Sequence, residues 1–504
     1  MHEIEIKLSH DGPLEPEGLG LEQEGVSTVG AVEVLSLRAT YYDTPDLRLA
    51  RNGITLRWRR GEAEAPVWTL KFPSDVGDGM VRRELKFPSS TKNAPKTIPK
   101  EVRVLVTAFA RREALAAVAE VEANRRSWML LGGAGEELAE ISEDDVSVSR
   151  GGKQIKTWRE IEVEARTLPA EGVRRLAHRL LAAGAEEAPP VPKLVKALGE
   201  AASTPPEPHW PDRLGEAAPA SEAVRLALGS GFQRVVQNDP ATRLSEVEPL
   251  HQMRVGTRRL RSDLRTFAPL IDSAWAEPLV VDLRWVGGLL GRVRDVDVLR
   301  ELVATTGNDL LENLQPVFAE LDARRAAEHA VVMDALASSR YVDFLDRLVA
   351  AVETPMLTAE AARPTREALP PLVGRAWSKL ATKAKKVGPS GSDEELHRVR
   401  ILAKRARYAA EAVAPALGVR GDEARRFASR AARLQDVLGA LQDTAMARDT
   451  LESLVARLST DGNALMAAGR LFERQERLAE QARESWPQAW SKLNDKKMRR
   501  WMKS

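Results

Sequence analysis

The chain has 504 residues, which is too long for one ordinary domain and predicts two to four domains. Its 75 lysines and arginines nearly balance its 73 aspartates and glutamates, so bulk charge favours no class of partner. Because the chain has no cysteine, disulfides, thiolate metal sites and cysteine nucleophiles are excluded. No segment has the pattern of a signal peptide or a membrane span, so we expect a cytoplasmic protein with no membrane partner.

The N-terminal residues 3–7 (EIEIK) alternate between charged and apolar side chains, which is the pattern of a strand with one charged face. A solvated edge strand has the same pattern. However, a second strand at residues 160–164 (EIEVE) repeats it. Stacked carboxylates repel one another unless a cation gathers them, and a divalent metal with oxygen ligands is the usual cation. The charged residues of the two strands are Glu3, Glu5, Lys7, Glu160, Glu162 and Glu164.

Residues 1 to about 200 are predicted to be β-rich, and the strands between the two acidic ones carry mostly basic residues. Asn52-Gly53 predicts a β-hairpin. Ordered charge on one face of many antiparallel strands predicts a closed barrel whose charged face lines the lumen. The alternative is a half-exposed sheet with a charged outer face. We expect strands at residues 32–42, 54–59, 67–71, 81–87, 140–148 and around Arg125, and helices at 111–121 and 170–183.

This region resembles the CYTH family of triphosphate tunnel metalloenzymes over residues 1 to about 198. The resemblance rests on the Glu-x-Glu-x-Lys start, the Tyr-Asp-Thr-Pro turn at residues 42–45, the Arg-x-Arg strand and the later charged positions. It implies basic residues that hold phosphoryl groups, namely Lys7, Arg57, Arg59, Lys71, Arg82, Arg125 and Lys193. It also implies carboxylates that hold Mg²⁺ or Mn²⁺, namely Glu3, Glu5, Glu84, Asp144, Glu160, Glu162 and Glu164.

Two positions depart from the pattern of the CYTH family. Lys86 follows Glu84 where many members continue the acidic alternation, and Pro192 precedes Lys193 where a serine is common. Whether Glu84 and Glu164 are metal ligands therefore stays open at this point.

Residues 201–220 are rich in proline and alanine, which predicts a stiff linker that joins no core. We therefore expect one domain at residues 1–200 and a second at 221–504. The second part is rich in alanine, leucine and arginine and is predicted to be helical. It aligns with itself, because residues 251–261 match 397–407 and residues 290–295 match 438–443. Two copies of a helical bundle are implied, at about 221–360 and 361–504.

In both copies a histidine and several basic residues share one face of a helix with 3.6 residues per turn. Like charges at this spacing destabilise a helix unless an anion lies over them, although a solvated basic face is the simpler alternative. The residues of these faces are His251, Arg254, Arg258, Arg261 and Arg265 in the first copy, and His397, Arg400, Lys404 and Arg407 in the second.

This half resembles the CHAD domain, a conserved-histidine α-helical domain, from about residue 221 to the C-terminus. The resemblance implies that the basic surface binds inorganic polyphosphate and has no catalysis of its own. Tyr408 is the only aromatic residue near the arginines, so bases would find little to stack on, and we expect no nucleic-acid partner.

The sequence thus predicts an α+β domain built on an antiparallel β-barrel (a tunnel), followed by an all-α helical bundle with an internal pseudo-twofold repeat. We expect a metal-dependent triphosphatase that hydrolyses inorganic triphosphate or polyphosphate, with polyphosphate bound by the helical half. Two alternatives stay open. One is a tunnel enzyme for an organic triphosphate, such as a thiamine triphosphatase or an adenylate cyclase. The other is a non-catalytic polyphosphate-binding protein.

Overall fold

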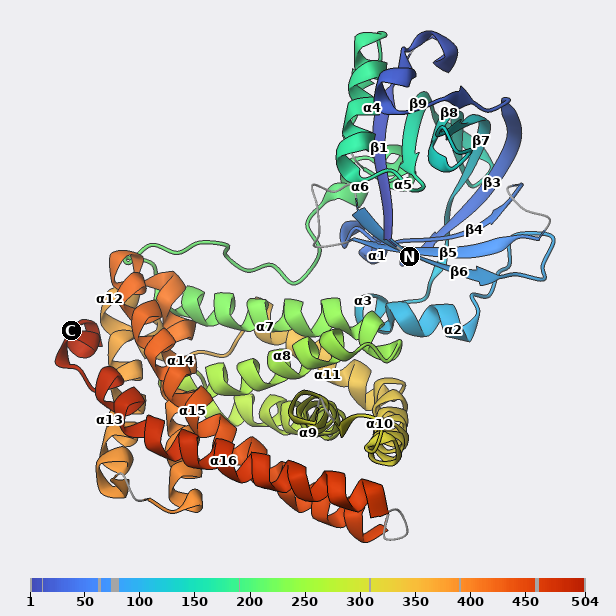
Figure 1. Cartoon of the computed structure of the whole chain (residues 1–504). Coiled ribbons are helices and arrows are strands. Elements are labelled where there is room, and N and C mark those ends of the chain that lie inside the picture. The colour runs from blue at the N-terminus through green and yellow to red at the C-terminus, as the bar shows by residue number, and fades with distance from the viewer. Residues whose placement is uncertain are drawn as a thin grey trace. The chain divides into compact units, whose positions relative to one another are not determined.

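The computed structural model describes residues 2–10, 12–61, 65–73, 81–189, 191–307, 310–388, 391–457 and 462–502. The chain divides into two compact units, Met1–Pro206 and Glu207–Ser504 (Figure 1). The first unit is built on one antiparallel sheet and the second is helical, as the sequence predicted.

The sheet of the first unit has ten strands. Their order is β10-β1-β6-β5-β4-β3-β7-β8-β9, with β2 paired to β7. The sheet curls until β9 pairs with β1, so that Lys7 lies opposite Glu162 and Glu5 opposite Glu164. The two acidic strands, which lie far apart in the sequence, are therefore neighbours. The strands are β1 (His2–Ser9), β2 (Thr28–Val29), β3 (Glu33–Asp43), β4 (Thr55–Arg60), β5 (Val67–Pro73), β6 (Val81–Pro88), β7 (Ala116–Leu131), β8 (Glu137–Arg150), β9 (Lys153–Ala165) and β10 (Glu186–Glu187).

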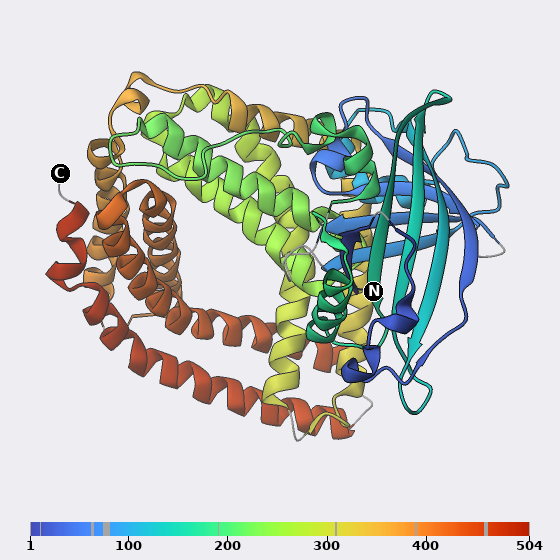
Figure 2. The same cartoon turned by 90° about the horizontal axis from the view of Figure 1, so that it is seen from above.

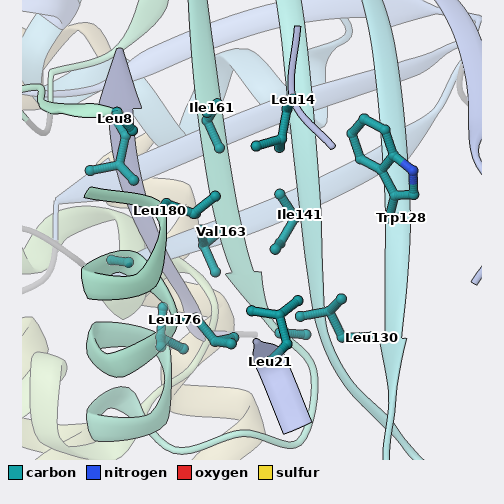
Figure 3. Packing of buried hydrophobic residues seen from close by; sticks show 14 of the residues in the cluster. Leu8, Leu14, Leu21, Trp128, Leu130, Ile141, Ile161, Val163, Leu176 and Leu180 are labelled. Atoms are coloured by element: carbon teal, nitrogen blue, oxygen red, sulfur yellow. The ribbon is translucent and has the colours of Figure 1, made fainter. Parts of the chain in front are cut away.

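The apolar faces of β1, β8 and β9 point away from the charged faces and are covered by helix α4 (Ala170–Ala182). Leu176 and Leu180 of this helix pack against Leu8, Ile161 and Val163, all almost fully buried (Figure 3). Burial of these side chains contributes most of the local stability, at about 25 cal/mol per Å² of apolar surface. Since the outer face is apolar and covered, the charged residues of the same strands face inward.

Two local predictions in this unit are wrong. Asn52-Gly53 does not close a hairpin. Instead, Asn52 ends the short helix α1 (Arg48–Arg51), and Gly53, with φ of +71°, leads into β4. Residues 111–121 do not form a helix, because β7 starts at Ala116. The alanine-rich start of β7 favours a helix by propensity. Pairing with β3 along one edge, and with β8 along the other edge from Glu120 onward, overrides that preference.

Short helices complete the first unit, and the chain then runs from Thr204 to Pro219 without a named helix or strand. Four of the predicted linker residues, 201–203 and 220, thus belong to helices. The short helices of the first unit are α1, α2 (Lys100–Arg103), α3 (Thr107–Ala110), α5 (Lys193–Leu198) and α6 (Glu200–Ser203).

The second unit consists of helices packed on one another. Helices α15 and α16 are its longest antiparallel pair and run side by side (Figure 2). Helix α14 begins with a capping box, in which Ser392 and Glu395 each accept a backbone N–H of the other. The helices are α7 (Ala220–Arg243), α8 (Val247–Thr266), α9 (Ser273–Thr306), α10 (Gln315–Leu336), α11 (Ser339–Glu353), α12 (Thr365–Ala368), α13 (Pro370–Val387), α14 (Asp393–Val413), α15 (Gly418–Arg457) and α16 (Gly462–Leu493).

The sequence repeat has a structural counterpart in these helices. A Cβ added at Gly291 of α9 would lie 3.6 Å from Nε of Arg254 on α8. In the second copy, a Cβ at Gly439 of α15 would lie 3.5 Å from Nε of Arg400 on α14. In both copies an arginine of one helix therefore lies against the equivalent glycine of the neighbouring helix. Among the described residues, no helix has the length and apolarity needed to cross a membrane.

Candidate functional site

A cavity of about 130 Å³ lies inside the curled sheet of the first unit and is lined mainly by charged side chains. Most of the predicted phosphate-binding and metal-binding residues line it. There are two exceptions: Glu160 lies just behind the wall, and the side chain of Glu3 falls outside the described residues, although its backbone pairs with Arg82. The predicted residues that line the cavity are Glu5, Lys7, Arg57, Arg59, Lys71, Arg82, Glu84, Arg125, Asp144, Glu162, Glu164 and Lys193.

One wall of the cavity is acidic. Asp144, Glu160 and Glu162 on β8 and β9 each offer a carboxylate oxygen, and these oxygens lie within 4.8 Å of one another. Burial alone would raise the pKa of Glu162, but Lys193, Lys7 and Arg125 outweigh burial and hold it well below its usual range. The cluster is therefore ionised at neutral pH.

The cations within this acidic wall come from β1, α5 and β7. Lys7 of β1 binds Glu162 and lies 3.6 Å from Glu5. Lys193, the first residue of α5, lies 3.0 Å from Asp144, 2.6 Å from Glu160 and 2.8 Å from Glu162. Burial would lower the pKa of Lys193, but the three carboxylates raise it well above its usual value.

Arg125 of β7 joins the same group. Its Nη2 donates to Asp144 at 2.7 Å and to Glu162 at 2.6 Å, and its Nε donates to Asp144 at 2.8 Å. We expected Arg125 to contact phosphate, whereas in this structure it holds two carboxylates in place.

The opposite wall is cationic and is formed by β4, β5 and β6. Arg57, Arg59, Lys71 and Arg82 line the cavity there. Burial, together with the positive charge of Arg57 and Arg125, lowers the pKa of Arg59 to about 9. Burial is the larger cause of this shift and the neighbouring cations add to it, so a bound anion would stabilise the charged guanidinium. Glu84 lies between Lys71 and Lys86, at 3.9 Å and 3.8 Å, and so forms part of this wall.

Sequence reasoning missed several residues that line the cavity. Tyr41 accepts a hydrogen bond of 3.3 Å from Arg57, and Arg166 binds both Glu140 and Glu164, the latter at 2.7 Å. The strand alternation offered a signal for these positions, since Glu140 lies opposite Glu164 in the β8–β9 register. The missed residues are Tyr41, Thr55, Lys86, Glu140 and Arg166.

The Tyr-Asp-Thr-Pro turn has a structural role. The fully buried carboxylate of Asp43 accepts backbone N–H groups from Thr44, Leu49 and Ala50 at 2.7, 2.9 and 2.9 Å. These bonds fix helix α1 at the start of β4, the strand that carries Arg57 and Arg59.

In the second unit, the basic residues of α8 and α14 lie close together. Burial, followed by the charges of Arg258, Arg400, Arg254 and Arg261, lowers the pKa of Lys404 to about 7. Helix α8 thus contributes three of the arginines that act on a lysine of α14. The two predicted basic faces are therefore close enough for their charges to act on one another.

The other predicted residues of these faces differ in their contacts. Arg254 binds Asp295 at 3.2 Å, and Arg407 binds Glu411 at 2.7 Å. Burial, followed by the positive charge of Arg405, lowers the pKa of Arg265. Nδ1 of His251 and Nδ1 of His397 are buried and form no hydrogen bond within the described structure.

The acidic wall fits a hard divalent cation. Carboxylate oxygens are the ligands that Mg²⁺ and Mn²⁺ prefer, and three residues supply them at short mutual distances. Glu5, which also lines the cavity, adds a fourth carboxylate close to Lys7.

Comparisons with known proteins give matches in both units. A CYTH domain matches residues 1–190 and a CHAD domain matches residues 226–452. Two uncharacterized proteins from two strains of Mycobacterium tuberculosis are each 32% identical over 521 residues, which is 95% of this chain and 94% of the relative.

Solved structures match each unit separately. The CHAD domain from the plant Ricinus communis is 26% identical with a TM-score of 0.46, and it covers 56% of this chain and 97% of that chain. A putative adenylyl cyclase from Hippeastrum, described as having a dominant triphosphatase activity, is 17% identical with a TM-score of 0.24, and covers 38% of this chain and 93% of that chain. Since both TM-scores lie below 0.5, family membership rests on the domain matches and the mycobacterial relatives. The chain belongs to the proteins that join a CYTH domain to a CHAD domain.

Proposed function

We propose that the CYTH domain hydrolyses inorganic triphosphate or polyphosphate with Mg²⁺ or Mn²⁺, and that the CHAD domain binds polyphosphate. The observation that carries the first part is the polarity of the cavity. A wall of four cations, in which the pKa of Arg59 is lowered to about 9, faces a wall of clustered carboxylates. A metal-bound polyphosphate has the complementary charges.

The cationic wall would bind the phosphoryl oxygens. Arg57, Arg59, Lys71 and Arg82 would stabilise the negative charge that shifts onto these oxygens as the P–O–P bond breaks. Asp144, Glu160 and Glu162, with Glu5, would hold the divalent ion, which when bound neutralises phosphoryl charge and lowers the pKa of a water molecule. Water adds to phosphorus, the bridging oxygen leaves with the remaining chain, and triphosphate yields diphosphate and phosphate.

The lining of the cavity favours an inorganic substrate over an organic one. Of the described residues that line it, Tyr41 is the aromatic one, and its ring is 3% exposed with its hydroxyl on Arg57. A nucleobase or a thiazolium ring would therefore have no exposed aromatic face to stack on.

A phosphate-release assay tests the proposed hydrolysis. We expect release from tripolyphosphate with Mg²⁺ or Mn²⁺, slower release from ATP and thiamine triphosphate, and none in excess chelator. Glu5→Gln, which removes a charge and keeps the shape, should lower turnover by about tenfold or more. Glu171→Gln is the matched control, because Glu171 is exposed on α4 and pairs with Arg174 alone. Full activity in chelator, or equal turnover of the two variants, would overturn the proposal.

The observation that carries polyphosphate binding is the position of Lys404 among four arginines of two helices. So much like charge destabilises the free protein, and a flexible polyanion that reaches both copies of the repeat would relieve it. Nucleic acid fits this surface less well. Arg258, Arg259 and Arg407 lie 5.6, 5.2 and 5.6 Å from the ring centre of Tyr408, which is 6% exposed and so offers no stacking face.

A further inference from the structure

Lys193 lies in an unusual position for a residue expected to contact phosphate. Its ammonium is within 3.0 Å of Asp144, 2.6 Å of Glu160 and 2.8 Å of Glu162, which are the same three residues that form the candidate metal cluster. The contact with Glu162 is a hydrogen bond donated by the ammonium, and the contacts with Asp144 and Glu160 are ion pairs. Lys193 therefore acts as an internal cation that offsets part of the negative charge of the acidic cluster.

The ammonium and a divalent ion compete for these oxygens. A divalent ion at its usual ligand distance of about 2.0–2.6 Å would take the position that Nζ now holds, and two cations so close repel strongly. Charge leads to the same conclusion. Within the described structure, the four carboxylates around Lys7 and Lys193 lie beside four cations, so this group is formally neutral, and an added ion would leave it with two excess positive charges. The carboxylates are Glu5, Asp144, Glu160 and Glu162, and the cations are Lys7, Arg125, Lys193 and Lys196.

We propose that Lys193 is a displaceable cation, whose ammonium leaves the carboxylates when the metal binds and moves into the cavity toward the phosphoryl oxygens. This inference rests on the proposed metal-dependent function of the same site. The phosphate chain supplies the negative charge that compensates the added ion, and Lys193 itself lines the cavity. Metal and triphosphate should therefore bind cooperatively, each raising the affinity of the other by the same factor.

The surroundings of α5 restrict this movement to the side chain of Lys193. Leu194, which is 1% exposed, fixes the helix in a core that also contains Leu37 and Val148. Lys196 keeps its place over the ring of Trp158 at 5.0 Å, and its carbonyl accepts a hydrogen bond of 2.7 Å from Lys156. Glu160 also retains partners without Lys193, because Trp158 donates to it at 2.6 Å and Lys196 lies 3.3 Å away.

Calorimetric titration of Mn²⁺ into the full chain tests the displacement directly. Lys193→Met removes the internal cation, so it should bind Mn²⁺ about tenfold or more tightly than the parent when no phosphate is present. Lys193→Arg keeps the charge and should bind no more tightly than the parent. Lys196→Met removes a lysine whose only ion pair with the described carboxylates of the cluster is the one with Glu160, and it should change the affinity by less than about threefold.

The second arm repeats these titrations with imidotriphosphate, a triphosphate with non-hydrolysable bridges. It should raise the Mn²⁺ affinity of the parent by about tenfold or more, and that of Lys193→Met much less. Lys193→Gln replaces Lys193→Met if the latter loses its cooperative unfolding transition.

Equal Mn²⁺ affinity of the parent and the Lys193→Met chain would overturn the displacement while leaving the proposed hydrolysis intact. If Lys193→Met binds Mn²⁺ more tightly than the parent, but the parent releases no phosphate from any substrate, the displacement is supported and the hydrolysis is overturned. If neither chain binds Mn²⁺ with or without imidotriphosphate, the metal centre and the displacement are both wrong.

Discussion

Arg125 holds Asp144 through two parallel hydrogen bonds, of 2.8 Å from Nε and 2.7 Å from Nη2, while the same Nη2 reaches Glu162. This side-on contact fixes the plane of the Asp144 carboxylate at the base of the acidic wall. Burial would lower the pKa of Arg125, but hydrogen bonding to Asp144 and the charges of both carboxylates raise it. Arg125 therefore acts on the residues that would hold the metal, besides any contact that it makes with phosphate.

Arg125→Lys should lower both Mn²⁺ affinity and triphosphate turnover by about tenfold or more. A lysine offers one point charge where the guanidinium makes a planar, two-bond contact, so the carboxylates would lose their orientation. The control is Arg126→Lys on the same strand, because Arg126 is more exposed and binds Glu143, which does not line the cavity. Calorimetry and phosphate release on both variants check this. Equal losses in the two would show that the effect is a general weakening of β7.

Arg57→Lys and Arg59→Lys should each reduce turnover by about tenfold or more without unfolding the domain. The reason is strongest for Arg59. Its surroundings lower even a guanidinium pKa to about 9, so an amine there, which has a lower ordinary pKa, would be less fully charged than a guanidinium at neutral pH. Arg60→Lys is the control, since this neighbour binds the carbonyl of Lys92 outside the cavity. Wild-type turnover in both cavity variants would mean that these arginines do not face the substrate.

Asp43→Ala should destabilise the CYTH domain by about 2–4 kcal/mol. Three buried backbone N–H groups would lose their acceptor, and the short helix α1 would lose its fixed start. Asp46→Ala, in the same turn, removes a partly exposed pair with Arg48 at 2.8 Å and a hydrogen bond of 2.7 Å from the Thr44 hydroxyl, and it should cost about 1 kcal/mol. Denaturant unfolding of the two variants measures the difference. If Asp46→Ala costs as much as Asp43→Ala, the backbone hydrogen bonds are not what the turn provides.

The sequence predicted local features of the cavity well, because strand alternation has a period of two and depends on few residues. Glu5 and Lys7 share a face for this reason, and Ile6 between them packs toward α4. The same local reasoning failed where pairing decides the structure. An alanine-rich segment near Ala116 joined β7, and Asn52-Gly53 ended a helix instead of closing a hairpin.

The sequence pattern did not predict in detail which residues far apart in the chain come into contact. The strand pattern placed acids on the first and last strands, and a closed barrel brings these strands together, but the pattern did not give the register in which β9 pairs with β1. Nor did it indicate that Lys193, from a helix after the sheet, would lie among Asp144, Glu160 and Glu162. Such positions depend on the packing of α5, which buries Leu194, and packing follows from the whole domain.

The CHAD domain should bind long polyphosphate through both copies of the repeat together. Removing charge at Arg254 and Arg258, or at Arg400 and Lys404, should each weaken binding, and the combination should nearly abolish it, because the second contact is intramolecular. The salt dependence should become less steep with each lost cation, as in counterion release from nucleic acids. Fluorescence polarisation on the full chain and the three variants, across a salt series, checks this. A combined variant that binds as the parent does would leave the basic faces a structural role only.

Lys404 should make the second unit sensitive to pH. Its pKa in the folded protein is lowered from the ordinary 10.5 to about 7 by burial and by Arg258, Arg400, Arg254 and Arg261. Between these two values the unfolded chain binds more protons at Lys404 than the folded chain does. The free energy of unfolding of the second unit should therefore rise with pH from about 7 to about 10.5. Lys404→Met should raise the melting temperature at pH 6–7 and reduce its pH dependence, since it removes a cation from a crowded positive site. Melting curves of both proteins between pH 6 and 9 check this.

The same linkage predicts that polyphosphate binding takes up a proton at Lys404. A polyanion over the four arginines raises the pKa of Lys404 above its free value of about 7, so the bound state is more fully protonated at pH 8. Affinity for long polyphosphate should therefore fall as pH rises from about 7 to 9, and calorimetry at pH 8 in buffers of different ionisation enthalpy should show uptake approaching about one proton per bound site. Lys404→Met supplies the comparison, because it lacks the group that titrates. If the parent and this variant take up the same number of protons, the charge of Lys404 does not change on binding, and the polyanion does not lie over the cluster formed by α8 and α14.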